Sequence, residues 1–172
     1  MIRKALLNDI GAVSAIYEKI HAEESAGRAC IGWQAGVYPV RATAEAALGR
    51  DDLFVYEEDG RVLASGIINR KQVDVYADGS WLYEADDSEV MVLHTLTVDP
   101  AEASRGIGAA IVSYYEEYAR ENGCTVLRID TNEKNAVARR FYKKLGYREA
   151  GCVPCVFNGI EGVMLVLLEK KL

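Results

Sequence analysis

A short segment, Ser104–Ala109, combines the residue types and the spacing of an anion-binding loop. Gly106 and Gly108 carry no Cβ atom, so successive backbone N–H groups can close around an anion there. Arg105 adds a positive charge beside them. A helix that followed would add its unpaired N–H groups and its dipole. The segment therefore predicts a phosphate or pyrophosphate site, although two glycines in this position could equally serve only a tight turn.

Two common nucleotide-binding motifs do not fit this segment. A P-loop needs Gly-Lys followed by Ser or Thr, and that run is absent here. The dinucleotide-binding motif G-x-G-x-x-G needs a third glycine where Ile111 stands. The segment therefore belongs to neither motif.

The patterns on either side predict the elements that position the segment. Val90–Val98 is apolar and rich in β-branched residues, which predicts a buried central strand. Gly106–Asn122 has one apolar stripe at helical spacing and is followed by a glycine, which predicts a helix. Thr125–Asp130 is then expected to be a strand, and Ala136–Leu145 a helix. The loop thus connects the central strand to a helix.

The rest of the chain predicts further elements in a mixed order. Glu58–Arg61 gives a strong hairpin signal between two short apolar runs, and Ser25–Val40 has no clear period and is expected to be a loop. This order predicts one α/β (α+β) domain over residues 1–172 with a mixed sheet. The other expected strands and helices are 2–6, about 9–24, Ala42–Leu48, Leu53–Glu57, Val62–Ile68, Tyr147–Cys152 and Val163–Leu168.

The composition limits the classes of partner. The formal net charge is −6, which argues against nucleic acid as the main partner and permits a cationic substrate such as an amine. No apolar run approaches the roughly 20 residues that a membrane span needs, so no membrane partner is expected. The first residues do not form a secretory signal, and a cytoplasmic location is expected by default.

The cysteines do not point to a metal site. Cys152 and Cys155 have C-x-x-C spacing, which could indicate a redox pair or half of a zinc site. No second pair supplies the further ligands that zinc needs, and the surrounding residues predict strand or loop rather than the helix start that lowers a thiol pKa. We therefore interpret both as ordinary small apolar residues and expect no metal.

The run from Val90 to Tyr147 resembles the GNAT superfamily, the general-control-type N-acetyltransferases that use acetyl-CoA. In that family a central strand leads to an R/Q-x-x-G-x-G/A loop around the cofactor pyrophosphate, and Ala103–Gly108 is similar to that loop. A second family hallmark begins with Asn-Ala and ends with aromatic-Tyr-x-x-Leu-Gly-Phe/Tyr, and the residues from Asn135 to Tyr147 match it. The one departure is Ala103, which lacks the side-chain contact often made at the first loop position.

The resemblance implies a fold and a set of roles. The fold would be a mixed, mostly antiparallel central sheet flanked by helices. Backbone groups of Leu96, Thr97 and Val98 would pair with the pantetheine arm of the cofactor, like an added strand. The Leu96 N–H would also polarise the thioester carbonyl and stabilise the oxyanion. The residues implied to hold the pyrophosphate are Ser104, Arg105, Gly106, Ile107, Gly108 and Ala109.

Two further roles that the resemblance implies have structural alternatives. Asn135 would hydrogen-bond the pantetheine arm, but its side chain could also be only a helix N-cap. Tyr142 would donate a proton to the departing thiolate, but it also fits the inward stripe of its helix and could be plain core.

A protonated amine must lose a proton before it attacks the thioester, and the sequence offers several routes. His94 lies on the same strand face as Val92 and Leu96 if the strand is regular, and its ordinary pKa suits a general base. A satisfied, buried histidine is the alternative reading. Glu89 at the strand entrance and a relay through water are the other candidates.

The acceptor is expected to bind in the variable parts of the chain. The residues that could line its pocket are Trp33, Tyr38, Tyr76 and Trp81. Aromatic groups in an acidic chain would suit a small amine, an amino acid or a polyamine. A protein or peptide acceptor, and a non-catalytic acyl-CoA sensor, remain as alternatives, and a homodimer is plausible.

Overall fold

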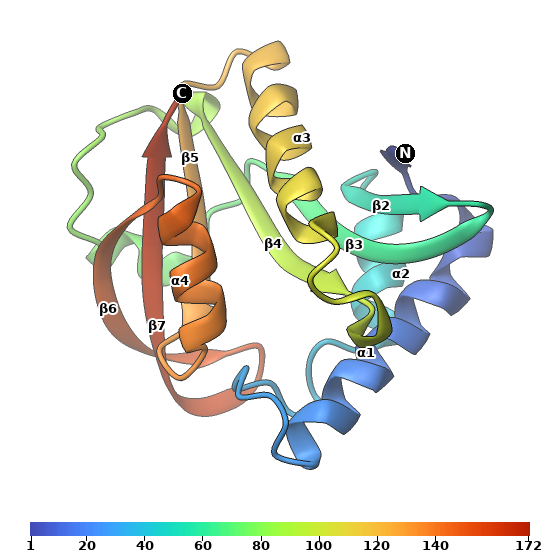
Figure 1. Cartoon of the computed structure of the whole chain (residues 1–172). Coiled ribbons are helices and arrows are strands. Elements are labelled where there is room, and N and C mark those ends of the chain that lie inside the picture. The colour runs from blue at the N-terminus through green and yellow to red at the C-terminus, as the bar shows by residue number, and fades with distance from the viewer.

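A seven-stranded sheet runs through the protein, with its strands in the order β1-β2-β3-β4-β5-β7-β6 (Figure 1). The computed structural model describes all 172 residues. Only the β4–β5 pair is parallel, and every other neighbouring pair is antiparallel. The strands are β1 (Ile2–Lys4), β2 (Leu53–Glu58), β3 (Arg61–Asn69), β4 (Val90–Val98), β5 (Val126–Asn132), β6 (Arg148–Phe157) and β7 (Ile160–Lys171).

Helices cover both faces of this sheet (Figure 1). On one face, α1 (Ile10–Ser25) and α2 (Arg41–Gly49) pack together against β2 and β3. On the other face lie α3 (Ile107–Glu121), over β3 and β4, and α4 (Ala136–Lys144). Four short 3-10 helices complete the fold: η1 (Leu7–Asp9), η2 (Asp74–Asp78), η3 (Asp87–Glu89) and η4 (Pro100–Glu102).

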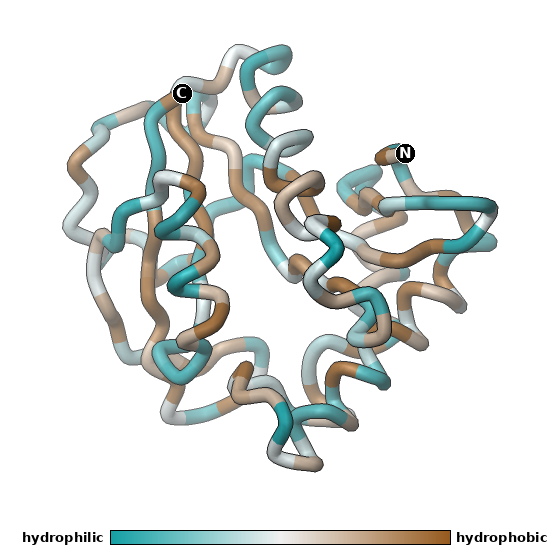
Figure 2. Tube along the Cα trace, viewed as in Figure 1, coloured by the Kyte–Doolittle hydropathy of each residue, from teal (hydrophilic) through white to brown (hydrophobic).

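The core follows from the apolar runs along the central strands, whose successive residues are buried and so face both layers of helices. Figure 2 shows hydrophobic segments along the central strands and hydrophilic segments on the outer turns of the helices. The largest cluster of buried residues lies between α3 and the sheet and includes Leu93, Tyr115 and Leu127. A separate cluster, which includes Tyr76 and Val90, packs under the segment that joins β3 to β4. Burial of apolar area on both faces holds the sheet as a middle layer.

The β4 strand is not regular. Ile67 of β3 pairs with His94 and Ser65 pairs with Thr97, so β4 carries one extra residue between these pairs. The extra residue is a β-bulge at Thr95, whose φ is 50°. A bulge reverses the side on which the following residues point. The prediction that His94 shares a face with Leu96 is therefore wrong, because it assumed a regular strand.

The structure confirms the predicted fold class, with every predicted helix and strand present. The main differences lie where individual strands end. The first strand stops at Lys4, because the Asp9 carboxylate accepts the Leu6 N–H and turns the chain into η1. The β6 strand runs on through Pro154, which an edge strand tolerates because one side of its backbone needs no partner. No helix has the combined length and apolar character that crossing a bilayer requires.

Replacement of Tyr115 by Phe tests how α3 is fastened to the sheet. The Tyr115 hydroxyl is fully buried and donates to the Met91 carbonyl at 2.7 Å and to the Arg128 carbonyl at 3.1 Å, one on each side of the β4–β5 pair. Its loss leaves both acceptors without this donor, so we expect the free energy of unfolding to fall by about 1–2 kcal/mol. The melting temperature should fall by about 3–6 °C.

Tyr118→Phe is the matched control, because Tyr118 lies on the same helix at intermediate burial and its hydroxyl makes no hydrogen bond to the protein. Thermal unfolding followed by circular dichroism measures both variants. An equal shift for the two would contradict the role given to the Tyr115 hydroxyl.

Candidate functional site

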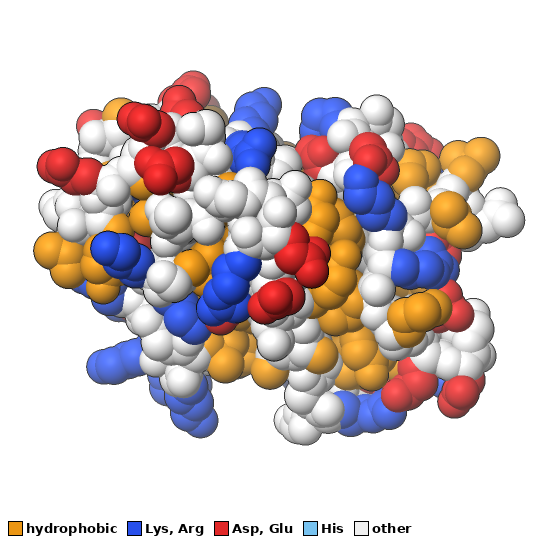
Figure 3. All heavy atoms as spheres, turned by 90° about the horizontal axis from the view of Figure 1, so that it is seen from above, with side chains coloured by type: hydrophobic (Ala, Val, Ile, Leu, Met, Phe, Trp, Pro, Cys, Tyr) orange, Lys and Arg blue, Asp and Glu red, His pale blue; other side chains and the backbone are white.

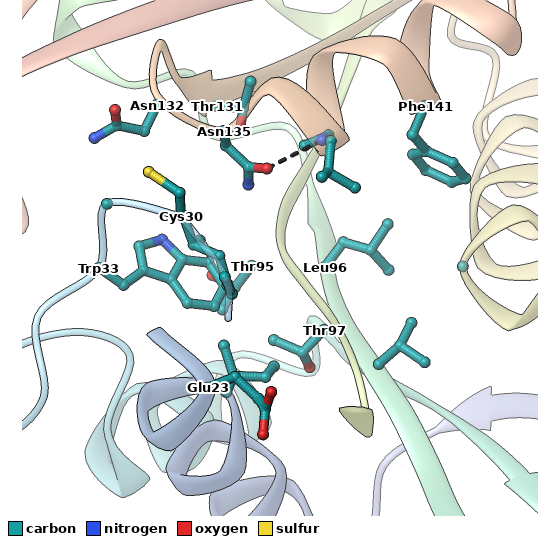
Figure 4. Close-up of a pocket in the computed structure, with 18 of the residues that line it drawn as sticks. Glu23, Cys30, Trp33, Thr95, Leu96, Thr97, Thr131, Asn132, Asn135 and Phe141 are labelled. Atoms are coloured by element: carbon teal, nitrogen blue, oxygen red, sulfur yellow. Dashed lines mark hydrogen bonds between the residues drawn. The ribbon is translucent and has the colours of Figure 1, made fainter. Parts of the chain in front are cut away.

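A cavity of about 630 Å³ opens where β4 and β5 separate. Their parallel pairing ends at Leu93 and Ile129, and the two strands then diverge toward their carboxyl ends (Figure 1). Figure 3, seen from above, shows the face at the start of β4, where a band of hydrophobic side chains lies between charged ones. Figure 4 shows Trp33 and Cys30 on one side of the cavity and Leu96 and Phe141 on the other. Its volume suits a ligand of moderate size.

The predicted anion-binding loop lines one end of this cavity. Ser104 and Gly106 have positive φ values of 66° and 80°, and Gly106 is the N-cap of α3. This conformation turns backbone N–H groups at the helix start toward one concave surface. The loop residues that line the cavity are Ser104, Gly106, Ile107, Gly108 and Ala109.

Gly108 leaves room at this surface. A Cβ placed on Gly108 would lie 3.5 Å from Phe141 Cζ and 3.6 Å from Val98 Cγ2, which are ordinary contacts. The protein itself therefore does not require glycine at this position. Gly108 is the second residue of α3 and lines the cavity, so a side chain there would lie beside the first N–H groups of the helix, where an anion is favoured.

Arg105 does not reach the cavity. Its guanidinium pairs with the Glu58 carboxylate at 2.6 Å and with the Glu102 carboxylate at 2.5 Å. These two partners raise the pKa of Arg105, and they also neutralise its charge. This pairing corrects the expectation that Arg105 supplies a positive charge at the rim. The groups that the loop presents to the cavity are backbone N–H groups.

One edge of β4 faces the cavity without a strand beside it. Thr95, Leu96, Thr97 and Val98 all line the cavity, and none of them has a pairing partner in β5. The bulge at Thr95 also leaves Thr95 and Leu96 outside the register with β3. An extended ligand could therefore pair with the backbone here, as an added strand does.

The start of α4 contributes two of the predicted residues. Asn135 caps the helix, with its side-chain oxygen accepting the Ala138 N–H at 3.0 Å, and it also lines the cavity (Figure 4). Tyr142 belongs both to the core and to the cavity wall. Burial first, and the nearby Asp130 second, raise the pKa of Tyr142. Its hydroxyl therefore keeps its proton at neutral pH, as a proton donor must.

The structure does not bring His94 or Glu89 to the cavity. His94 points away from it, with Nε2 3.1 Å from the Asn69 Oδ1 atom, and burial lowers the His94 pKa to about 4. Glu89 ends η3 at the other end of β4. Neither residue can take a proton from a molecule in the cavity, so neither enters the mechanism proposed below.

The four predicted pocket aromatics separate into two pairs. Trp33 and Tyr38 line the cavity, and their rings meet edge to face at 6.0 Å. Tyr76 and Trp81 do not line it; they pack against each other at 5.4 Å in the cluster beside β6 and β7. The expectation that this second pair contacts the acceptor is corrected.

The α1–α2 loop closes the cavity on the side of Trp33 and Tyr38. The Glu24 carboxylate accepts the backbone N–H groups of Ile31 at 3.0 Å and Gly32 at 2.6 Å, which fixes the turn. A Cβ on Gly32 would overlap the Asn132 side-chain amide, so the loop lies directly against the end of β5. Tyr38 packs edge to face on Phe157 at 5.5 Å, which joins the loop to the β6–β7 hairpin.

Asp130 is the cavity residue that the sequence reasoning missed. It stands on β5 just after the last β4–β5 pair, it lines the cavity, and its carboxylate accepts the Tyr76 hydroxyl at 2.8 Å. Burial raises its pKa to about 6, and the hydrogen bond from Tyr76 opposes that rise. A carboxylic acid that ends a buried strand was the signal in the sequence.

The cysteines and acidic residues form no metal centre. No three His, Cys, Asp or Glu side chains gather closely enough to hold an ion. Cys152 and Cys155 are free thiols on β6, and burial raises the pKa of both. Neither is therefore activated as a nucleophile.

Comparison with known proteins identifies the family. Residues 16–147 match the acetyltransferase (GNAT) family. The chain belongs to the GNAT family. An uncharacterized N-acetyltransferase of Methanocaldococcus jannaschii is 34% identical over 98 residues, which cover 56% of this chain and 42% of that protein. An uncharacterized N-acetyltransferase of Bacillus subtilis is 33% identical over 60 residues, which cover 35% of this chain and 40% of that protein. The chain thus matches less than half the length of these two relatives.

Solved structures share the GNAT fold over the whole chain. A ribosomal-protein-alanine N-acetyltransferase from Brucella melitensis has a TM-score of 0.71 at 21% identity, covering 100% of this chain and 99% of that one. The structure of yncA from Salmonella typhimurium is described with its cofactor acetyl-CoA. It has a TM-score of 0.68 at 20% identity, and the match covers 99% of this chain and 92% of that one. At these identities the likeness concerns the fold.

The Gly108→Ala variant tests the anion site of this GNAT protein. The new methyl group meets only ordinary contacts in the protein but would lie at the cavity wall beside the first N–H groups of α3. We expect the melting temperature to stay the same or rise slightly, because Ala favours a helix. Binding of coenzyme A, measured by calorimetry, should weaken about tenfold or more, because hydrogen bonds to a charged group are lost.

Gly11→Ala is the matched control, since Gly11 is also the second residue of a helix. A Cβ on Gly11 would meet no other atom within 4 Å. It should leave coenzyme A affinity unchanged. Equal affinities of the two variants for coenzyme A would contradict the assignment of Ser104–Ala109 as the phosphate site.

Proposed function

We propose that this protein is an acetyl-CoA-dependent N-acetyltransferase that acts on a small-molecule amine. One observation carries the proposal: a single cavity has the loop Ser104–Ala109 in its wall together with Trp33, Tyr38 and Asp130. The loop suits the phosphates of a coenzyme A ester. The two aromatic rings and the carboxylate suit a compact cation.

The donor would bind mainly through the backbone. Its pyrophosphate would lie on the N–H groups that begin α3, and its pantetheine arm along the unpaired β4 edge from Leu96 to Val98. The Asn135 side-chain nitrogen is free to donate, because only its oxygen is used in capping α4. The acetyl-CoA described with the Salmonella neighbour supports this choice of donor.

The proposed reaction is direct transfer. The amine nitrogen attacks the thioester carbonyl, a carbon–nitrogen bond forms, and the carbon–sulfur bond breaks. The Leu96 N–H would donate to the carbonyl oxygen as it gains negative charge. The Tyr142 hydroxyl would give a proton to the departing sulfur. The nitrogen, which has already lost one proton before attack, would lose a second one after attack, and that proton would restore the hydroxyl.

The contacts of the α1–α2 loop beside Trp33 and Tyr38 favour a small-molecule acceptor over a protein chain. The α1–α2 loop lies against β5 at Gly32 and Asn132, and Val37 lies 3.6 Å from the Cβ position of Gly159 in the β6–β7 hairpin. A polypeptide acceptor would need a groove between these same elements. The ribosomal-protein acetyltransferase of Brucella shares the fold, but this wall argues against a peptide acceptor for the present chain.

Two measurements test the proposal. Acetyl-CoA at about a hundred times its dissociation constant should raise the melting temperature by about 5–10 °C. Detection of released thiol should then show turnover with small primary amines such as tyramine or spermidine, and not with ribosomal-protein N-terminal peptides.

The two measurements separate the alternatives. Turnover with the peptides only would favour a protein acceptor. Stabilisation without any turnover would indicate a sensor. No stabilisation by any coenzyme A ester would contradict the donor assignment.

The Tyr142→Phe variant tests the proton donor. The ring stays in the core, while the hydroxyl that faces the cavity is removed. We expect kcat to fall about a hundredfold, with the affinity for acetyl-CoA little changed. Steady-state kinetics between pH 6 and pH 9 measure the effect. A kcat within about twofold of the wild type at every pH would exclude the role.

A further inference from the structure

Asp130 occupies the point where the sheet opens. Ile129 is the last β5 residue to pair with β4, while Asp130 still pairs with Leu167 of β7. Its backbone is therefore held as part of the sheet, and its side chain faces the cavity. On the opposite wall, the Tyr38 hydroxyl hydrogen-bonds Thr95 at the β4 bulge. A small molecule bound beside Trp33 and Tyr38 would lie between these two walls.

The carboxylate has no cation beside it. Its hydrogen-bond partner is Tyr76, and it makes no salt bridge. The other titratable groups that it influences are Tyr38 from the α1–α2 loop, Tyr142 from α4 and Cys155 from β6. All of these are neutral at pH 7. An uncompensated carboxylate inside a cavity attracts a cation, and the cavity can admit one.

Tyr76 is brought to Asp130 by the long connection between β3 and β4, residues 70–89, the green segment beside β6 and β7 in Figure 1. Glu169, fully buried on β7, accepts the Leu82 N–H at 2.8 Å and the Tyr83 N–H at 3.2 Å. The Trp81 indole donates to the Tyr76 carbonyl at 2.6 Å. These bonds fix the segment and hence the Tyr76 hydroxyl.

A cation–π contact holds the segment from the side of the sheet. The Arg128 guanidinium of β5 lies 4.1 Å from the Trp81 ring centroid. Arg128 is two residues before Asp130, so the strand that carries the carboxylate also holds the segment that orients it.

We propose that Asp130 accepts the proton that a cationic primary amine must lose before it attacks, and that Tyr76 is the positioning residue for its carboxylate. This inference rests on the proposed function and names its proton acceptor. An N–H bond of the ammonium group breaks, its electron pair stays on nitrogen, and a carboxylate oxygen of Asp130 gains the proton. The resulting carboxylic acid returns the proton to water after transfer.

The electrostatics agree with this role. Burial raises the pKa of Asp130 to about 6, so at pH 7 most of the carboxyl is ionised but more basic than an exposed aspartate. The Tyr76 hydroxyl stabilises the ionised form and so lowers the pKa of Asp130. Activity should rise with pH through about 6, because the base must be ionised to act.

Two variants test the proposal in kinetics with acetyl-CoA and the faster of tyramine and spermidine. Asp130→Asn should lower kcat/KM about a hundredfold at pH 7. It should also abolish the acid limb of the pH profile, which is the rise of kcat/KM with pH near 6. Tyr76→Phe should retain turnover but move that limb upward by about one pH unit, since a hydrogen bond to the charged form is lost. Tyr83→Phe, in the same segment and without contact to Asp130, should leave the limb in place.

A carboxyl ¹³C NMR titration of the full-length protein gives a readout independent of turnover. The Asp130 signal should titrate near pH 6 in the wild type and higher in Tyr76→Phe. Titration near pH 4, an unchanged limb in Tyr76→Phe, or an Asp130→Asn variant within about threefold of the wild type would overturn the proposal. Failure of acetyl-CoA to bind the wild type would instead refute the proposed function.

Discussion

The cavity exists because β4 separates from β5 beyond Leu93 and Ile129. Neighbouring parallel strands ordinarily satisfy one another's backbone groups along their length. Here β4 carries a bulge at Thr95, while β5 stays paired with β7 as far as Asn132. The opening therefore exposes a backbone edge on one side and the Asp130 side chain on the other. One geometric irregularity thus supplies both the backbone edge along which the proposed donor would lie and the wall beside which the proposed acceptor would lie.

The two helices beside this opening both begin at the cavity. Gly106 begins α3 and Asn135 begins α4, and both residues line the cavity. Helix starts present N–H groups that do not depend on a flexible side chain. This explains why the pairing of Arg105 with Glu58 and Glu102 is compatible with an anion site. It also explains why Ala103 can stand where the family often has Gln or Arg.

Placing Asp130 inside the cavity opposes stability, because burial disfavours the ionised carboxylate. The Tyr76 hydrogen bond offsets part of this penalty. The hydrogen bonds of Glu169 and the contact of Arg128 with Trp81 hold the segment that delivers Tyr76. A connection held by these contacts thus supports a carboxylate whose burial opposes stability.

The fold class, the helix and strand order, and the position of the Ser104–Ala109 loop can all be predicted from the sequence. Those features follow from apolar periodicity and from glycines, which act between near neighbours in the chain. The orientation of His94, the pairing of Arg105 and the contact of Tyr76 with Asp130 arise only when the chain has folded. A bulge shifts every later side chain, and Tyr76 and Asp130 are 54 residues apart. Contacts of this kind depend on how the sheet is assembled, and no local pattern records that.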